Sequence, residues 1–341
     1  MMGEPSRGRH SAPVVTDRHT AGMPDGPVDV VVLGEVLVEL SSAEEWADGR
    51  PVRLGFSGDA LNVAAAAVGA GARAALLARV PDDELGDALV ARVSELGVDT
   101  RALIRAPGQH GLYLTHADPS GERHFIYVRR GNAGSQLGAD DVDEQLVRSA
   151  GVVVASGIAC AVSTSARAAV TRAAQLAEKF VYDPNFRPRL TTAGAARAAL
   201  VGLASMTHVV TPSWPGEART LLGLDETAGD AEALTALSEL GFGDVVLTCG
   251  PSGALVRCDG LVHRVPGVEA ARVIDQTGAG DCLTGTVAAR IALGDTLLEA
   301  VRLGVAAASL SVQGQGGTGH VPSLEHTTRA AARQTIPEGA S

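Results

Sequence analysis

The chain of 341 residues has little positive charge, few aromatic side chains and no long apolar runs. No run approaches the roughly 20 apolar residues of a membrane-spanning helix, which excludes a transmembrane protein of that kind. The 28 lysine and arginine residues are outnumbered by 39 acidic ones, and the net charge of −11 argues against nucleic-acid binding, which requires a basic surface. With 3% aromatic residues, base stacking on aromatic rings is also disfavoured.

Cysteine is scarce as well. The four cysteines lie at positions 160, 249, 258 and 282, with no CxxC pair and no neighbouring histidine pattern. Neither a zinc site nor a disulfide framework is therefore expected. This usage fits a reducing compartment, and we expect a cytoplasmic protein.

Both ends of the chain differ in composition from the part between them. Residues 1–27 contain proline, glycine, serine and arginine but lack the apolar core of a secretory signal, so a disordered tail is expected. Residues 325–341 are polar, and a loose tail is expected there too. The folded domain is predicted to span residues 28–324.

Within this domain, short apolar runs alternate with alanine-rich stretches of helical period. The runs lie at 28–33, 151–155, 180–182, 208–210 and 244–247. Such runs, separated by helices, are typical of strands buried on both faces of a mainly parallel sheet. The sequence therefore predicts an α/β fold.

Two segments break the alternation. Residues 36–57 and 100–130 resemble short antiparallel strands, and Asp118-Pro119-Ser120-Gly121 has the composition of a hairpin turn. We expect both segments to form one small sheet, a lid that excludes water from a site at the carboxyl ends of the parallel strands. Exposed sheet edges often pair between subunits, which would give a homodimer or a larger homo-oligomer through the lid.

The most informative stretch is Asp275-Gln276-Thr277-Gly278-Ala279-Gly280-Asp281, which runs into an amphipathic helix. Gly278, Ala279 and Gly280 have little or no side chain, so their amides can approach a phosphate at the positive end of the helix and form an anion hole. Asp281 would repel that phosphate unless it accepts a proton from the nucleophile, which makes it a candidate general base. The alternative is an aspartate that only caps the helix.

A second glycine turn, Thr248-Cys249-Gly250-Pro251-Ser252-Gly253, follows the apolar run 244–247. It would let a nucleotide lie close to the backbone, or it is only a tight turn. The sequence has neither a P-loop nor a Gly-x-Gly-x-x-Gly motif after the first strand, so those motifs do not explain the glycines.

The stretch at 275–281 resembles the carboxy-terminal signature of the ribokinase-like (PfkB) family of sugar kinases. Further blocks are similar to those of the 2-keto-3-deoxygluconate kinases within this family. They lie at 34–40 (GEVLVEL), 55–62 (GFSGDALN), 111–113 with 121–123, and 183–190 (DPNFRPRL). Each block alone is modestly specific, but their order and spacing together are strong.

The resemblance implies a ribokinase-like, Rossmann-type three-layer sandwich with a small β lid. It also implies ATP and Mg²⁺ as cosubstrates and transfer of the γ-phosphoryl group to a sugar hydroxyl. Asp281 matches the catalytic base, and residues 278–280 match the anion hole. The implied nucleotide site falls on Thr248, Gly250, Gly253, Thr277, Gly278 and Gly280.

The sugar-binding positions implied by the resemblance are Gly58, Asp59, Asn62, Tyr113, Tyr127, Arg129 and Arg187, and Glu39 matches a carboxylate that binds sugar hydroxyls. Their chemistry suits an acid sugar, because an arginine fork binds a carboxylate and tyrosine hydroxyls bind keto and hydroxyl oxygens. The alternatives are tyrosines that only pack the lid, arginines that are surface charges, and polar residues at 59 and 62 that only cap a helix.

Glu217 matches the glutamate of the family's Asn-x-x-Glu motif, which organises Mg²⁺ and its waters. The asparagine position carries Trp214, a departure from the family pattern. A water-mediated Mg²⁺ bridged mainly by ATP phosphates is the alternative arrangement.

The expected activity is phosphorylation of the acid sugar 2-keto-3-deoxy-D-gluconate to its 6-phosphate by MgATP. Two alternatives stay open at this point. One is a family kinase for a neutral sugar such as fructose, or for a nucleoside. The other is a non-catalytic sugar- or nucleotide-sensing protein on the same fold, although a sensor has no need of the base at Asp281.

Overall fold

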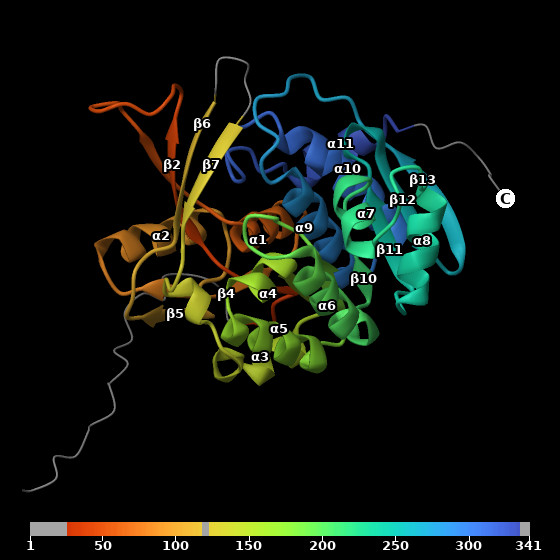
Figure 1. Cartoon of the computed structure of the whole chain (residues 1–341), viewed down its shortest axis with the longest axis horizontal. Coiled ribbons are helices and arrows are strands. Elements are labelled where there is room, and N and C mark those ends of the chain that lie inside the picture. Colours follow the sequence, from red (N-terminus) through yellow and green to blue (C-terminus); the bar gives the residue numbers. More distant parts are fainter. Residues whose placement is uncertain (1–25, 118–122, 335–341) are drawn as a thin grey trace, which may run out of the picture.

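The computed structural model describes residues 26–117 and 123–334. Across them one sheet has the strand order β13-β12-β11-β10-β9-β8-β1-β4-β5 (Figure 1). All neighbours from β11 to β5 pair in parallel, and β12 and β13 are antiparallel. The strands are β1 (Val30–Leu33), β4 (Ala74–Pro81), β5 (Leu103–Ala106), β8 (Val152–Ser156), β9 (Phe180–Asp183), β10 (Val209–Val210), β11 (Asp244–Thr248), β12 (Gly253–Cys258) and β13 (Leu261–Pro266).

This sheet confirms the predicted α/β fold. All five predicted apolar runs form strands in it. These strands are mainly apolar along their length because helices cover both faces of the sheet. The pattern misses β4, since its Ala-Ala-Leu-Leu-Ala stretch consists of residues that favour helices.

Helices cover both faces of the sheet and complete three layers (Figure 1). The first helical layer contains α1 (Asp59–Gly69), α2 (Glu84–Glu95), α9 (Ala279–Ala292) and α10 (Leu297–Ser311), with α11 (Leu324–Ala331) packed on α10. The second contains α3 (Glu144–Ser149), α4 (Gly157–Val162), α5 (Thr164–Leu176), α6 (Ala193–Leu203), α7 (Gly216–Leu222) and α8 (Asp230–Glu239). Alternate strand residues enter the two cores: Val30 and Val32 enter one, and Val31 and Leu33 the other.

A second sheet, the lid, projects from the main body (Figure 1). Its order is β3-β2-β6-β7, with β2 (Leu37–Ser42), β3 (Arg53–Ser57), β6 (Leu112–Ala117) and β7 (Arg123–Val128). The two hairpins are antiparallel as predicted, but β2 and β6 pair in parallel. This follows because β2 comes after β1 and β6 after β5, so both leave the main sheet at its carboxyl edge.

One predicted lid boundary is wrong. The segment 100–130 was expected to belong to the lid throughout, but residues 103–106 form β5, which pairs with β4 in the main sheet. The pattern of a short isolated strand does not show which sheet it joins. The predicted turn at 118–121 lies outside the described residues.

The predicted loose tail from residue 325 is also wrong at its start. Ser323 caps α11 by accepting a hydrogen bond from the amide of His326 at 3.3 Å, and Ala330 and Ala331 are buried against α10. Residues 335–341 and residues 1–25 of the predicted N-terminal tail lie outside the described residues. Among the residues described, no helix is both long and apolar enough to cross a membrane.

The strand order places a crevice at the middle of the sheet. From β1 the chain proceeds to β4 and β5 on one side and returns to β8 on the other. Helices therefore diverge between β1 and β8, and ligands of open α/β sheets bind at the carboxyl ends beside such a switch point. Ser156, which ends β8, donates a hydrogen bond to the carboxylate of Asp59, which begins α1.

The close approach of α9 to α1 positions the glycine turn, the name used here for residues 275–281. A Cβ built on Gly285 of α9 would lie 2.2 Å from the carbonyl oxygen of Val63 and 2.9 Å from the Cβ of Ala66, both on α1. Only glycine allows the two helices to approach so closely. The first turn of α9 is thereby held beside the first turn of α1.

We predict that Gly285→Ala lowers the free energy of unfolding by about 1 to 3 kcal/mol, because the added methyl group forces α9 away from the α1 backbone. Gly202→Ala is the matched control, since a Cβ at this exposed position of α6 meets no atom within 4 Å. The control should be neutral or more stable by up to about 1 kcal/mol. Urea unfolding of both variants checks this, and equal stabilities would contradict it.

Candidate active site

A cleft of about 1320 Å³ opens between the lid and the carboxyl edge of the main sheet. Most side chains and glycines that the sequence singled out are brought together in its lining. These are Gly58, Asp59, Asn62, Tyr113, Tyr127, Arg129, Arg187, Glu217, Thr248, Thr277, Gly278, Ala279, Gly280 and Asp281.

The glycine turn presents bare backbone at one wall of the cleft. Helix α9 begins at Ala279, and its N-cap Gly278 has a φ of 80°, which favours glycine. A Cβ at Gly280 would meet nothing within 4 Å, because the space beside it belongs to the cleft. No side chain of the described residues caps α9. The Ala279 amide donates to the Gln276 carbonyl at 3.3 Å, so the amides of Gly278 and Gly280, together with the positive end of the helix dipole, are the groups available to an anion.

Asp281 lies in the first turn of α9 and is only 8% exposed. Its Oδ2 accepts a hydrogen bond from Asn62 Nδ2 at 2.8 Å, and its Oδ1 accepts one from Asn185 Nδ2 at 3.2 Å. Burial, followed by the charge of Asp59, raises the pKa of Asp281 to about 6, although the amides and Arg187 act to lower it. The carboxylate is therefore ionised at neutral pH and its pKa suits proton acceptance.

Asp59, Asp183 and Glu217 line the cleft together with Asp281. Burial raises the pKa of Asp59 and of Glu217. Burial, and next the charges of Glu217 and Asp281, raises the pKa of Asp183 well above its usual range. The guanidinium of Arg187 acts to lower the pKa of all four acids, so its charge reaches each of them.

The lid supplies tyrosine and arginine side chains to the opposite wall. Tyr113 of β6 and Tyr127 of β7 are direct cross-strand partners, with ring centroids 5.9 Å apart. The guanidinium of Arg129 lies 4.7 Å from the Tyr127 ring centroid, and its Nη1 is 3.4 Å from Oε2 of Glu35. Burial is the main cause that raises the pKa of Glu35 to about 7. The lid thus brings two tyrosine side chains and a cation to the cleft.

The acidic wall of the cleft suits a cation that arrives with a ligand. Oε2 of Glu217 accepts from the Ser213 amide at 2.8 Å, and its other oxygen accepts from the Phe186 amide. In residues 26–117 and 123–334 no group of three or more His, Cys, Asp or Glu side chains is arranged to hold a metal ion directly. The several carboxylates of the cleft nevertheless favour a cation nearby. A hydrated cation that is bound mainly through the phosphates of a ligand agrees both with these carboxylates and with the lack of a direct metal site.

Three predicted residues do not line the cleft. Glu39 is buried behind Tyr113 and accepts a hydrogen bond from its hydroxyl at 2.6 Å. Gly250 is exposed at the start of a 3₁₀ turn. Gly253 serves packing, because a Cβ there would lie 2.1 Å from the Val265 carbonyl oxygen of the neighbouring strand. Of the second glycine turn only Thr248 reaches the cleft.

The sequence reasoning missed the roles of Asp183 and Asn185 in the cleft. Asp183 ends β9, and its carboxylate accepts hydrogen bonds from the Asn185 amide at 3.0 Å and the Thr284 hydroxyl at 3.4 Å. Asn185 has a φ of 40°, which turns the chain so that its side-chain amide reaches Asp281. The signal was present, since polar residues directly after a buried parallel strand lie at the ligand-binding edge.

Bare amides at a helix N-terminus, an ionised buried carboxylate beside them, and a lid that covers both are the parts needed for phosphoryl transfer to an alcohol. The fold and the site therefore define a phosphotransferase of the ribokinase-like type.

Comparison with known proteins supports this class. Residues 28–324 match the model of the pfkB family carbohydrate kinases. The 2-dehydro-3-deoxygluconokinase of Thermoproteus tenax is 35% identical over 87% of this chain and 92% of its own, and the 2-dehydro-3-deoxygalactonokinase of Haloferax volcanii is 28% identical over 83% and 90%. Among solved structures, the 2-dehydro-3-deoxygluconokinase of Thermotoga maritima has a TM-score of 0.79 at 22% identity, covering 90% of this chain and 99% of that one. A putative ribokinase II of E. coli with ATP and Mg²⁺ also has a TM-score of 0.79, at 24% identity and the same coverage.

The chain belongs to the PfkB family of carbohydrate kinases. It is therefore an ATP-dependent sugar kinase, which confirms the enzyme class and the ribokinase-like fold expected from the sequence.

The environment of Asp281 yields a prediction about its titration. Asn62→Leu removes a hydrogen bond that lowers the pKa of Asp281, so this pKa should rise by roughly one pH unit, as expected for a charged hydrogen bond of about 1.5 kcal/mol. Carbon-13 NMR titration of labelled aspartate carboxyls measures it. Thr284→Val is the control, because its hydroxyl contacts Asp183 instead. If the pKa of Asp281 were unchanged in Asn62→Leu, the hydrogen bond from Asn62 would not be a cause of that pKa.

Proposed function

We propose that the enzyme transfers the γ-phosphoryl group of ATP to the primary hydroxyl of 2-keto-3-deoxy-D-gluconate, the acid sugar also called 2-dehydro-3-deoxygluconate. The observation that carries the proposal is the arrangement of the cleft. A buried carboxylate and bare amides occupy one wall, and a tyrosine pair with an arginine occupies the other. Two of the relatives described above act on 2-dehydro-3-deoxy sugar acids by name, which supports this substrate class.

Asp281 is the proposed general base. Its carboxylate is held from two sides by Asn62 and Asn185, so its position is set before the substrate arrives. It accepts the proton of the attacking hydroxyl while the amides of Gly278 and Gly280 stabilise charge on the transferring phosphoryl group. Closure of the lid keeps water from competing as the acceptor.

The nucleotide is proposed to lie along Thr248 and Thr277, with its terminal phosphate at the glycine turn. Mg²⁺ supplies charge neutralisation of the phosphates when it is bound. Glu217 and Asp183 are the side chains that would hold its water shell, and both are buried acids beside the cleft. Trp214 stands at the position of the family asparagine. Its indole ring packs against Arg219, whose guanidinium lies 5.0 Å from the ring centroid.

The acid group of the sugar is proposed to bind Arg129 and Arg187. Arg129 is held in place by Glu35 and the Tyr127 ring, and Arg187 is exposed on the loop after β9 with its charge directed at the acids of the cleft. The hydroxyl of Tyr127 is proposed to donate to a keto or hydroxyl oxygen, and the Tyr113 oxygen, whose proton is donated to Glu39, to accept from a sugar hydroxyl. Glu39 then acts through Tyr113, whose hydroxyl it binds, and not by contact with the sugar.

The panel experiment that tests this function is a coupled ADP-release assay with ketodeoxygluconate, ketodeoxygalactonate, gluconate, fructose, ribose and adenosine as acceptors. The highest kcat/KM should fall on a 2-keto-3-deoxy sugar acid. A preference for fructose or adenosine would overturn the substrate class while leaving the kinase intact. No turnover with any of these acceptors would likewise contradict the proposed substrate.

Asp281→Asn should lower kcat by roughly 10² to 10⁴ while ATP-analogue affinity is retained, because the amide cannot accept the proton. In the wild-type enzyme, kcat/KM should be level above the raised pKa and fall as pH drops through about 6, since protonation removes the base. The residual activity of Asp281→Asn should not show this fall in kcat/KM at acidic pH. Rate measurements from pH 5 to 9 check both points, and a near-normal kcat would remove Asp281 from the role.

Arg187→Ala should raise KM for ketodeoxygluconate by roughly 10- to 100-fold, as expected for a charged hydrogen bond of about 1.5 to 3 kcal/mol. KM for a neutral sugar should change far less. Arg130→Ala is the matched control, because Arg130 is exposed beside the lid arginine and does not line the cleft. Equal effects on acid and neutral sugars would contradict the carboxylate assignment.

A further inference from the structure

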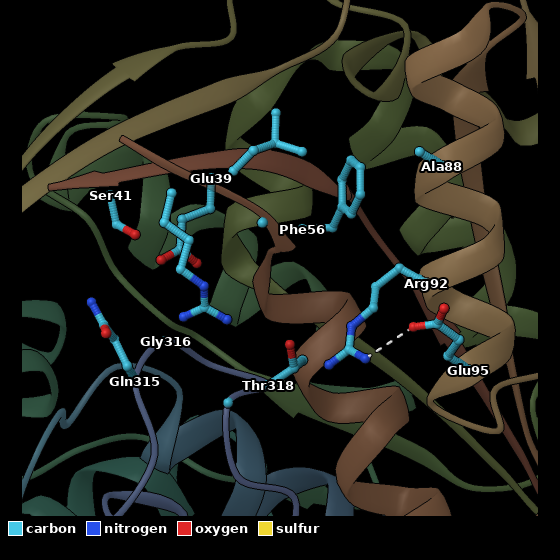
Figure 2. A pocket seen from close by; sticks show the side chains of 13 residues that line it. Glu39, Ser41, Phe56, Ala88, Arg92, Glu95, Gln315, Gly316 and Thr318 are labelled. Atoms are coloured by element: carbon cyan, nitrogen blue, oxygen red, sulfur yellow. Dashed lines mark hydrogen bonds and ion pairs between the residues drawn. The ribbon is translucent and has the colours of Figure 1, made fainter. Parts of the chain in front are cut away.

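A second pocket lies behind the lid and shares no lining residue with the catalytic cleft. Its volume is about 360 Å³, within the range of sites for small ligands. Its walls come from β2 and β3 at the base of the lid, from helix α2, and from the loop 315–319 (Figure 2). We call it the rear pocket.

The rear pocket contains two arginines with spare hydrogen-bonding capacity. Arg92 reaches in from α2 toward Thr318 (Figure 2). Its one ion pair within the described ranges, with Glu95 at 3.3 Å, is an exposed contact of low strength. Arg53 of β3 lines the pocket, and its side chain has no hydrogen-bond or ion-pair partner in the part of the chain that the structure describes. Two such forks, with the hydroxyls of Ser41 and Thr318, are donors suited to a carboxylate or phosphate.

Glu39 supplies an acceptor to the same pocket. Its Oε2 binds the Tyr113 hydroxyl, and its Oε1 has no donor among the described residues. The charge of Glu39 would repel an anion placed against it, but it would accept a hydrogen bond from a hydroxyl group. The ring of Phe56 adds an apolar wall (Figure 2). The lining thus suits a short molecule with an anionic head and a hydroxylated body.

We propose that the rear pocket binds a small hydroxylated organic anion, and that this ligand acts as an effector of the kinase. The anionic head lies between Arg53 and Arg92, and a hydroxyl lies at Glu39. This site is separate from the sugar, nucleotide and metal positions proposed above.

Contacts link the walls of the rear pocket to the catalytic cleft. Tyr113, which holds Glu39, lines the cleft. The amide of Gly316 donates to Oδ2 of Asp275 at 2.6 Å, and Oδ1 of Asp275 accepts from the Thr277 amide at 3.0 Å. A shift of the loop 315–319 would therefore also move the glycine turn.

The neighbouring Gly317 makes a further link. A Cβ on Gly317 would lie 2.2 Å from Nδ2 of Asn62, the atom that donates to Asp281. The loop is thus packed directly behind the side chain that holds the proposed base. Because Gly316 borders the rear pocket, an occupant contacts the segment that supports Asn62.

The position of the pocket predicts the direction of the effect. Two walls belong to the lid and two to the main body, so an occupant joins the lid to the body and favours the closed arrangement. A ligand shifts such an equilibrium by its difference in affinity for the two states. We therefore expect the effector to lower KM for the sugar.

The test measures binding of two probes, glycerate with a carboxylate head and glycerol 3-phosphate with a phosphate head. Calorimetry uses the full chain with the catalytic cleft filled by a non-hydrolysable ATP analogue and sugar. At least one probe should bind, and the preferred probe identifies the head group. The double variant Arg53→Gln, Arg92→Gln should bind it at least tenfold more weakly.

Ala88→Phe is a second variant, because Ala88 is an exposed residue of α2 that points into the rear pocket and a phenyl ring would fill it (Figure 2). It should also lose binding, without removing any charge. Arg329→Gln is the control for loss of an exposed arginine, since Arg329 lies on α11, outside both pockets. It should bind as the wild type does.

Kinetics supply the second readout. The bound probe should lower the sugar KM at least threefold in the wild type and in Arg329→Gln but not in the two pocket variants. Absence of binding by both probes at 10 mM, or equal binding by the wild type and both pocket variants, would overturn the proposal. Binding is measured without turnover, so this outcome is distinguishable from a wrong choice of sugar substrate.

Discussion

The close contact between α9 and α1 is the constraint on which the rest of the site depends. Gly285 lets the two helices approach to backbone contact, and this places their first turns side by side at the carboxyl edge of the sheet. Asn62 and Asp281, one from each first turn, then lie within hydrogen-bond distance. The glycine turn, the proposed base and the side-chain amide that orients it therefore lie together at this edge.

The cleft also shows how charge is distributed for catalysis. Buried acids are costly in a folded protein, and burial raises the pKa of Asp183, Glu217 and Asp59. Asp281 avoids a larger shift because Asn62, Arg187 and other donors favour its ionised form. The result is a carboxylate that is charged at neutral pH, at the positive end of a helix, where a phosphate and an alcohol can meet. The lid contributes two tyrosine side chains and a cation to the same cleft.

Much of the fold and part of the candidate site could be predicted from the sequence. The five apolar runs became neighbouring strands, and the glycine turn lies where a helix begins beside the cleft. Both depend on residues near one another in the chain. The sheet to which residues 103–106 belong could not be predicted, because a short strand has the same pattern in either sheet. The position of Glu39 behind Tyr113 depends on the register of β2 and β6, which the pattern of neither strand contains.

By itself the sequence determined the fold class and the family, and it predicted the chemistry of the glycine turn, because strand and helix periodicity and a glycine-rich helix N-terminus are local properties. Only the tertiary structure decided which side chains meet. Asn62 and Asp281 are 219 residues apart, and Asn185 joins them only through a backbone turn after β9. The rear pocket likewise exists only where the lid, α2 and the loop 315–319 converge. Such contacts are set by the packing of whole layers, and no local pattern contains them.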